Sequence, residues 1–100
     1  MNIESTISKQ KIRGSGYKKG YNVFVYNNEH TPYEVVVLAL FSSGLATDML
    51  KASTLTKQID KAGYIYFPFA TNKLAALSTE WTLRGFGLQS ETLFEEGEEK

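Results

Sequence analysis

Residues 21–41 read YNVFVYNNEHTPYEVVVLALF, and this stretch decides which fold the sequence predicts. Residues 21–26 are mostly aromatic or β-branched, which favours a β-strand. Residues 27–32 (NNEHTP) are turn-forming residue types. Residues 33–41 (YEVVVLALF) are apolar at nearly every position, which is typical of a central strand that is buried on both faces. The stretch therefore predicts a β-hairpin with residues 27–32 as its connection.

The segment that follows the hairpin predicts a helix and then an edge strand. Ser42, Ser43 and Gly44 break the second strand and offer a helix cap. Apolar residues then recur at helical spacing at Leu45, Met49, Ala52, Leu55, Ile59 and Ala62. Gly63 stands where a left-handed C-cap belongs. Residues 64–70 (YIYFPFA) favour a strand, and Pro68 places it at a sheet edge because proline has no N–H to donate.

A second helix is expected over residues 72–84, with Thr71 as its cap. Its apolar stripe is formed by Leu74, Leu77 and Trp81, and Gly85 follows at its end. These elements predict an α+β fold, an antiparallel sheet of three to four strands with two helices packed on one face. The fourth strand is expected near the N-terminus or over residues 86–88.

The length of 100 residues predicts one domain. We assign residues 1–88 to a single globular domain that carries a basic, glycine-rich arm or loop at residues 9–20. Residues 89–100 are assigned to an acidic tail that frays. Five bases against one acid give residues 1–20 a charge of +4, whereas five acids against one base give residues 89–100 a charge of −4. The whole chain has no net charge, so this asymmetry is internal.

Several classes of function are disfavoured by the composition. The chain has no cysteine, which excludes disulfides and thiolate metal sites, and its one histidine, His30, lies in a predicted turn. We expect no cofactor, no bound metal and no catalytic residue. No apolar run approaches the ~20 residues of a membrane helix, and no signal peptide is visible. These observations predict a cytoplasmic protein without a membrane partner.

Aromatic residues in the predicted edge strand are the main sign of function. An exposed aromatic edge must be covered either by the second helix or by another chain. Two neighbouring apolar residues also lie between glutamates in the acidic tail. They either dock into a partner or pack onto the domain. The candidate protein-contact residues are Tyr64, Tyr66, Phe67, Phe69, Leu93 and Phe94.

The sequence thus indicates a small non-enzymatic protein that acts by protein–protein contact. It would serve as an inhibitor or regulatory subunit, or as a self-assembling accessory protein of the phage type, and its partner is another protein or a second copy. The alternative is binding of single-stranded nucleic acid, because cations interleaved with aromatic rings suit a phosphate backbone and stacked bases. The residues for that alternative are Lys9, Lys11, Arg13, Tyr17, Lys18, Lys19 and Tyr21.

Overall fold

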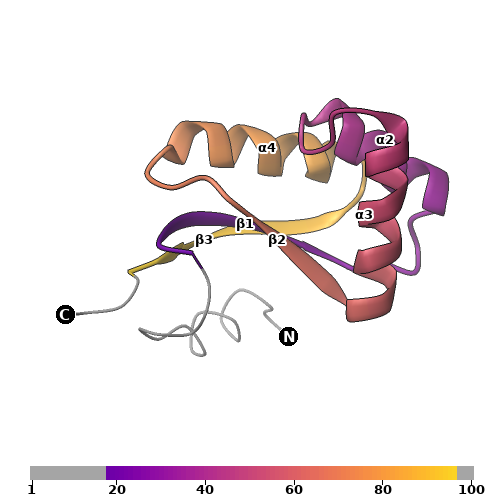
Figure 1. The fold of residues 1–100 in the computed structure, drawn as a ribbon, viewed down its shortest axis with the longest axis horizontal. Helices are drawn as coiled ribbons and strands as arrows, with labels where there is room; N and C mark the ends of the chain where they lie inside the picture. Colours follow the sequence, from indigo (N-terminus) through magenta and orange to yellow (C-terminus); the bar gives the residue numbers. More distant parts are fainter. Residues whose placement is uncertain (1–17, 97–100) are drawn as a thin grey trace.

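The computed structural model describes residues 18–96, which form an α+β fold with three helices and a three-stranded antiparallel sheet (Figure 1). In chain order the elements are β1 (Gly20–Tyr26), α2 (Tyr33–Ser42), α3 (Met49–Ala62), β2 (Tyr64–Pro68), α4 (Lys73–Gly85) and β3 (Gln89–Glu95). The predicted class and the antiparallel sheet are confirmed. Residues 86–88, considered for a fourth strand, form the connection between α4 and β3. The N-terminal candidate for that strand lies outside the described residues.

The sheet has the strand order β2-β1-β3, with β1 in the centre and antiparallel to both neighbours. Val23 of β1 lies opposite Phe67 of β2 and Thr92 of β3, which fixes both registers. The predictions of a strand at residues 21–26 and of an edge strand around Pro68 are therefore confirmed within the described part of the chain. One face of β1 carries Val23 and Val25, and the other carries Phe24.

Residues 89–95 of the predicted acidic tail form a strand, so the expectation that this part of the tail frays was wrong. Residues Gln89–Glu95 pair with the whole length of β1 as β3. Leu93 is buried, and the carboxylate residues Glu91 and Glu95 are buried as well. Pairing with the central strand β1 satisfies the backbone groups along one edge of β3, a long-range effect that outweighs the weak strand preference of an acidic segment.

The apolar run at residues 33–41 is helix α2 instead of a strand, and the predicted hairpin was therefore wrong. Pro32 precedes the helix in an extended conformation, and its carbonyl accepts hydrogen bonds from the backbone N–H groups of Val35 and Val36. A short run that is apolar on every side has no period to separate a helix from a strand. Its burial against two other helices decides between them, since α2 packs on α3 and α4.

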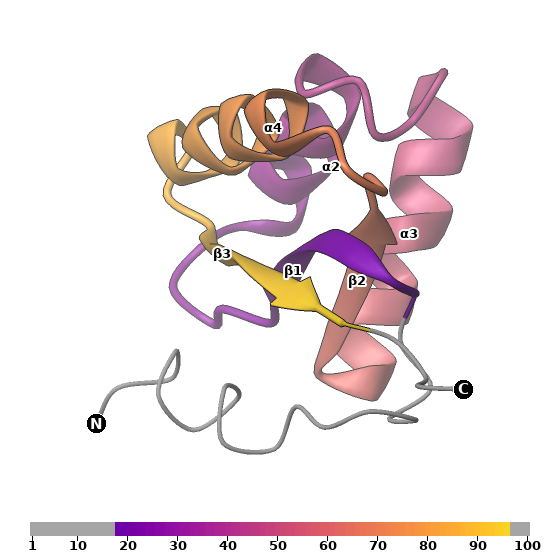
Figure 2. The same cartoon turned by 90° about the vertical axis from the view of Figure 1, so that its left-hand side faces the viewer.

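All three helices contribute to one core on the sheet face that carries Val23 and Val25. Helix α4 packs on β1 and β3, α3 packs on β2, and α2 lies against both helices (Figures 1 and 2). The core cluster contains Val23, Val25, Val37, Ala39, Leu40, Ala46, Ala52, Leu55, Ile59, Ala76, Leu83 and Leu88. The sequence predicted the two helices α3 and α4, and α2 is a third helix that it did not predict.

Capping residues set both ends of α3 and the start of α4. Asp48 accepts a hydrogen bond from the Lys51 backbone N–H at 2.7 Å, so α3 begins at Met49 and not at the predicted Leu45. At its other end Gly63 has φ +92°, which confirms the predicted left-handed C-cap. Helix α4 is capped by Asn72 instead of Thr71, and the Asn72 side chain accepts from the Ala75 N–H at 3.1 Å.

Candidate protein-contact surface

Helix α4 presents two large apolar side chains, Leu74 and Trp81, to solvent. Leu74 is 79% exposed and Trp81 is 70% exposed, whereas the buried residues of the helix are Ala76, Thr79 and Leu83. The sequence was expected to bury Leu74 and Trp81 against the sheet, and that expectation was wrong. The helix carries two stripes at helical spacing, and the stripe with smaller side chains packs inward, where it allows a close approach to the sheet.

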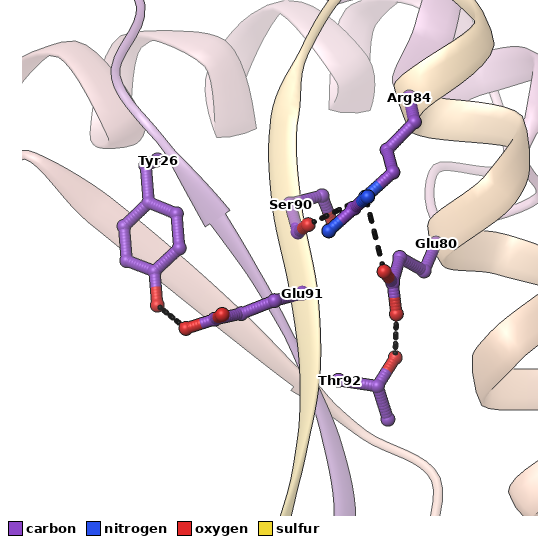
Figure 3. Close-up of polar contacts among 6 residues, drawn as sticks. All are labelled: Tyr26, Glu80, Arg84, Ser90, Glu91 and Thr92. Atoms are coloured by element: carbon purple, nitrogen blue, oxygen red, sulfur yellow. Dashed lines mark hydrogen bonds and ion pairs between the residues drawn. The ribbon is translucent and has the colours of Figure 1, made fainter. Parts of the chain in front are cut away.

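A polar network holds α4 in this orientation on β3 (Figure 3). Arg84 forms an ion pair with Glu80 one turn away, with 3.0 Å between Nε and Oε2. The Arg84 Nε–H also donates to the backbone carbonyl of Ser90 at 3.0 Å. On β3, the Thr92 hydroxyl donates to Glu80 Oε1 at 2.6 Å. Because Glu80 and Arg84 face β3, the neighbouring Trp81 is turned away from the sheet.

We expect Thr92→Val to lower the free energy of unfolding by about 1 to 2 kcal/mol, because Glu80 loses a short hydrogen bond while the side-chain shape is kept. The matched control is Thr82→Val, since the Thr82 hydroxyl donates only to the Ser78 carbonyl within α4. That control should change the free energy by less than about 0.5 kcal/mol. Urea unfolding monitored by circular dichroism measures the free energy of unfolding of both variants. Equal losses would show that the network does not fix the orientation of α4.

Helix α2, which contacts α4, adds exposed apolar side chains to the same layer. Leu38 is 46% exposed and Phe41 is 42% exposed, and Glu34 is the one charged residue of this helix. Among the described residues, most of the exposed large apolar side chains lie on helices: Tyr33, Leu38, Phe41, Met49, Leu50, Leu74 and Trp81. We use the term outer helical face for the exposed apolar side chains of these two contacting helices, Leu38 and Phe41 on α2 and Leu74 and Trp81 on α4. Periodicity alone did not reveal it.

The aromatic residues of β2, together with Phe69 just after it, are divided between the two faces of the sheet. Tyr64 and Tyr66 lie on the face opposite the helices, where their ring centroids are 6.0 and 5.6 Å from that of Phe24. Phe67 and Phe69 are half-buried on the other face and pack against the core. The four residues predicted at this edge therefore do not form one surface.

The pair predicted in the tail is also divided. Leu93 is buried, whereas Phe94 is half exposed with its ring centroid 4.8 Å from that of Tyr21. On the same strand Glu91 accepts a hydrogen bond from the Tyr26 hydroxyl at 3.0 Å (Figure 3). The sheet face opposite the helices thus combines aromatic rings with buried carboxylates.

Most of the predicted nucleic-acid residues, Lys9, Lys11, Arg13 and Tyr17, lie outside the described residues. Lys18 and Lys19 are exposed, but they lead directly into Gly20, which lies opposite Glu95 in the sheet. Tyr21 is half-buried and packs against the core and Phe94. The described part of the arm therefore brings its two cations next to an acidic strand end.

A pocket of about 380 Å³ lies where the turn after β1 meets α2 and α3, and its lining includes Glu29, Tyr33 and Asp60. His30 is exposed and does not line this pocket; its backbone N–H donates to Asn28 Oδ1 at 2.9 Å. Over residues 18–96, no group of three or more His, Asp or Glu side chains is placed to hold a metal ion.

Within the same residues, no helix has the length and apolar character needed to cross a lipid bilayer. Comparison of the sequence with protein-family models and with curated proteins gives no match. The function therefore has to be inferred from the surface of the molecule itself.

Proposed function

We propose that this protein is a non-enzymatic binding protein that acts by protein–protein contact through the outer helical face. The observation that carries the proposal is the exposure of Trp81, at 70% of its surface, on a helix that packs inward through Ala76, Thr79 and Leu83. Tryptophan is among the residues that contribute most to binding energy in protein interfaces. An inhibitor or regulatory subunit, and a self-assembling accessory protein of the phage type, are roles that such a surface can serve in the cytoplasm.

The size of the outer helical face supports this proposal. From their exposed fractions, its four side chains together offer roughly 450 Å² of apolar surface, most of it from Leu74 and Trp81 on α4. Covering an exposed tryptophan or leucine is worth roughly 1 to 3 kcal/mol per side chain. Since the hydrogen bonds from Arg84 to the Ser90 carbonyl and from Thr92 to Glu80 hold α4 on β3, the surface is in place before a partner arrives.

Binding of single-stranded nucleic acid is less well supported. The outer helical face has no charge among its four residues, whereas nucleic-acid affinity depends on cations that contact phosphates. The described cations of the arm, Lys18 and Lys19, lie directly before Gly20, which pairs with the buried Glu95 of β3. The sequence pI of about 6.6 also argues against nucleic-acid binding, because nucleic-acid-binding domains are typically basic.

Site-specific photo-crosslinking tests the proposed function. A photoreactive phenylalanine analogue replaces Trp81 in one variant and Leu50 in a control, because Leu50 is also exposed but lies on α3. Each purified variant is irradiated in an extract of its natural source, and mass spectrometry identifies the adducts. We expect one defined protein adduct from position 81, either a different chain or a second copy, and none from position 50.

A third variant, with the analogue in place of Tyr64, tests the other face of the sheet. A defined adduct from position 64 together with none from position 81 would overturn the proposal, because the contact would then lie on the face opposite the helices. Equal adducts from positions 50 and 81 would also overturn it, because they would show non-specific labelling.

A further inference from the structure

We infer that the partner of the outer helical face is a second copy of this chain, with α4 packed antiparallel against α4 of that copy. The inference rests on the proposed function and adds the identity and the geometry of the partner. In Figure 1, α4 lies in the outermost layer of the described molecule, with one side facing the sheet and the other side facing outward. A two-fold symmetric pair requires a surface that is complementary to itself, and the outward face of α4 meets this requirement.

The outward face of α4 has its centre between Leu77 and Ser78. Leu74 and Trp81 are seven residues apart, which is two helical turns and about 10.5 Å along the axis. The buried residues Ala76 and Thr79 lie on the opposite side of the helix, so Leu74 and Trp81 point directly away from the sheet.

A two-fold axis through this centre pairs the large side chains with one another. In the antiparallel arrangement, Leu74 of each copy meets Trp81 of the other, and the two Ser78 residues meet near the axis. The small Ser78 side chain permits a close approach of the two helices. At the flank, the Thr82 hydroxyl already donates to the Ser78 carbonyl at 3.0 Å, so this hydroxyl needs no partner across the interface.

The charges of α4 are compatible with a second copy. None of Leu74, Leu77, Ser78 and Trp81 is charged, so the centre of the pair brings no like charges together. The charged residues Lys73, Glu80 and Arg84 all lie at the β3 side of the helix. In the antiparallel pair, Lys73 of one copy comes within about two residues' rise, roughly 3 Å along the axis, of Glu80 of the other. A strongly basic or acidic partner would find no counter-charge on this face.

The area predicts a weak dimer. A stable interface buries about 800 Å² per partner. The exposed surface of Leu74 and Trp81, the two large apolar side chains that α4 brings to the pair, is less than half of that. The remainder has to come from the polar rim around α4. We therefore expect a monomer–dimer equilibrium that is visible at micromolar to millimolar concentrations.

Three measurements on the full chain test this inference. Sedimentation velocity over a dilution series should show a mass that rises from one chain towards two. Trp81 is the only tryptophan, so its emission should shift to shorter wavelength as the concentration rises and the indole is covered. The chain has no cysteine, so Ser78→Cys should form a disulfide-linked dimer with oxidised glutathione, whereas Gln58→Cys on α3 should not.

Leucine substitutions provide the matched control. Leu74 and Leu50 are both 79% exposed and both lie in the first turn of a helix. Leu74→Glu should weaken the dimer at least tenfold, and Leu50→Glu should leave it unchanged, with the circular dichroism of both variants unaltered. Trp81→Glu is a second disruptive variant if Leu74→Glu does not fold.

The outcomes separate this inference from the proposed function. A wild-type chain that stays monomeric at millimolar concentration would overturn the inference that the partner is a second copy. A different protein crosslinked from position 81 would still support the proposed function in protein binding. A dimer that survives both Leu74→Glu and Trp81→Glu would overturn α4 as its interface. Disulfide formation in Leu74→Cys but not in Ser78→Cys would overturn the antiparallel arrangement.

Discussion

Leu83→Ala should lower the free energy of unfolding by about 3 kcal/mol, whereas Trp81→Ala should change that of the monomer by less than about 0.5 kcal/mol. Leu83 is fully buried and Trp81 is 70% exposed, although both lie in the last turns of α4. Truncating a buried leucine removes its transfer free energy and leaves a cavity. Truncating an exposed tryptophan leaves the core of the monomer intact.

Urea unfolding at a concentration low enough to keep the chain monomeric measures both variants. Circular dichroism is the signal, since Trp81 is absent from one of them. The comparison tests the orientation of α4, on which the candidate contact surface depends. A loss from Trp81→Ala as large as that from Leu83→Ala would mean that the tryptophan packs into the core, and the outer helical face would no longer exist.

Gly20→Ala should destabilise the fold by about 3 kcal/mol, because the start of β1 has no room for a side chain. A Cβ atom at Gly20 would lie 2.3 Å from the carbonyl oxygen of Ala70, and this glycine has φ +105°. The same stretch of backbone is closed by hydrogen bonds from Tyr21 N–H to the Ala70 carbonyl and from Phe69 N–H to the Tyr21 carbonyl, both 2.7 Å. Thermal unfolding should show a clear drop in Tm.

Gly63→Ala is the matched control for this effect. Gly63 has a similar φ of +92°, but nothing lies within 4 Å of its added Cβ. This variant should therefore cost only the left-handed backbone strain, about 1 to 2 kcal/mol. Equal losses from the two variants would contradict the close approach of β1 to Ala70.

Local sequence signals predicted the elements whose pattern allows one interpretation. The strand at residues 21–26 follows from β-branched and aromatic residues, and the end of α3 follows from Gly63, which takes the left-handed conformation that glycine tolerates. Pro68 correctly indicated an edge strand, because a residue without an N–H is unsuited to a central one. The α+β class followed from these elements.

Two elements could not be assigned from local signals. The run that forms α2 is apolar on all sides, so neither period is visible, and its helical state depends on packing between α3 and α4. The acidic segment that forms β3 has little intrinsic preference for a strand, and its state depends on pairing with β1. Both outcomes come from contacts between residues that are distant in the sequence.

The candidate contact surface also depends partly on local sequence and partly on tertiary contacts. The sequence by itself determined that α4 has an apolar stripe at Leu74 and Trp81, because helical spacing places these residues on one side. Only the tertiary structure decided that this stripe faces solvent, because the Glu80–Arg84 pair and Thr92 hold the opposite, smaller stripe against the sheet. A helix with two apolar stripes can pack by either one, and the choice depends on the shape and hydrogen bonds of the surface that it meets.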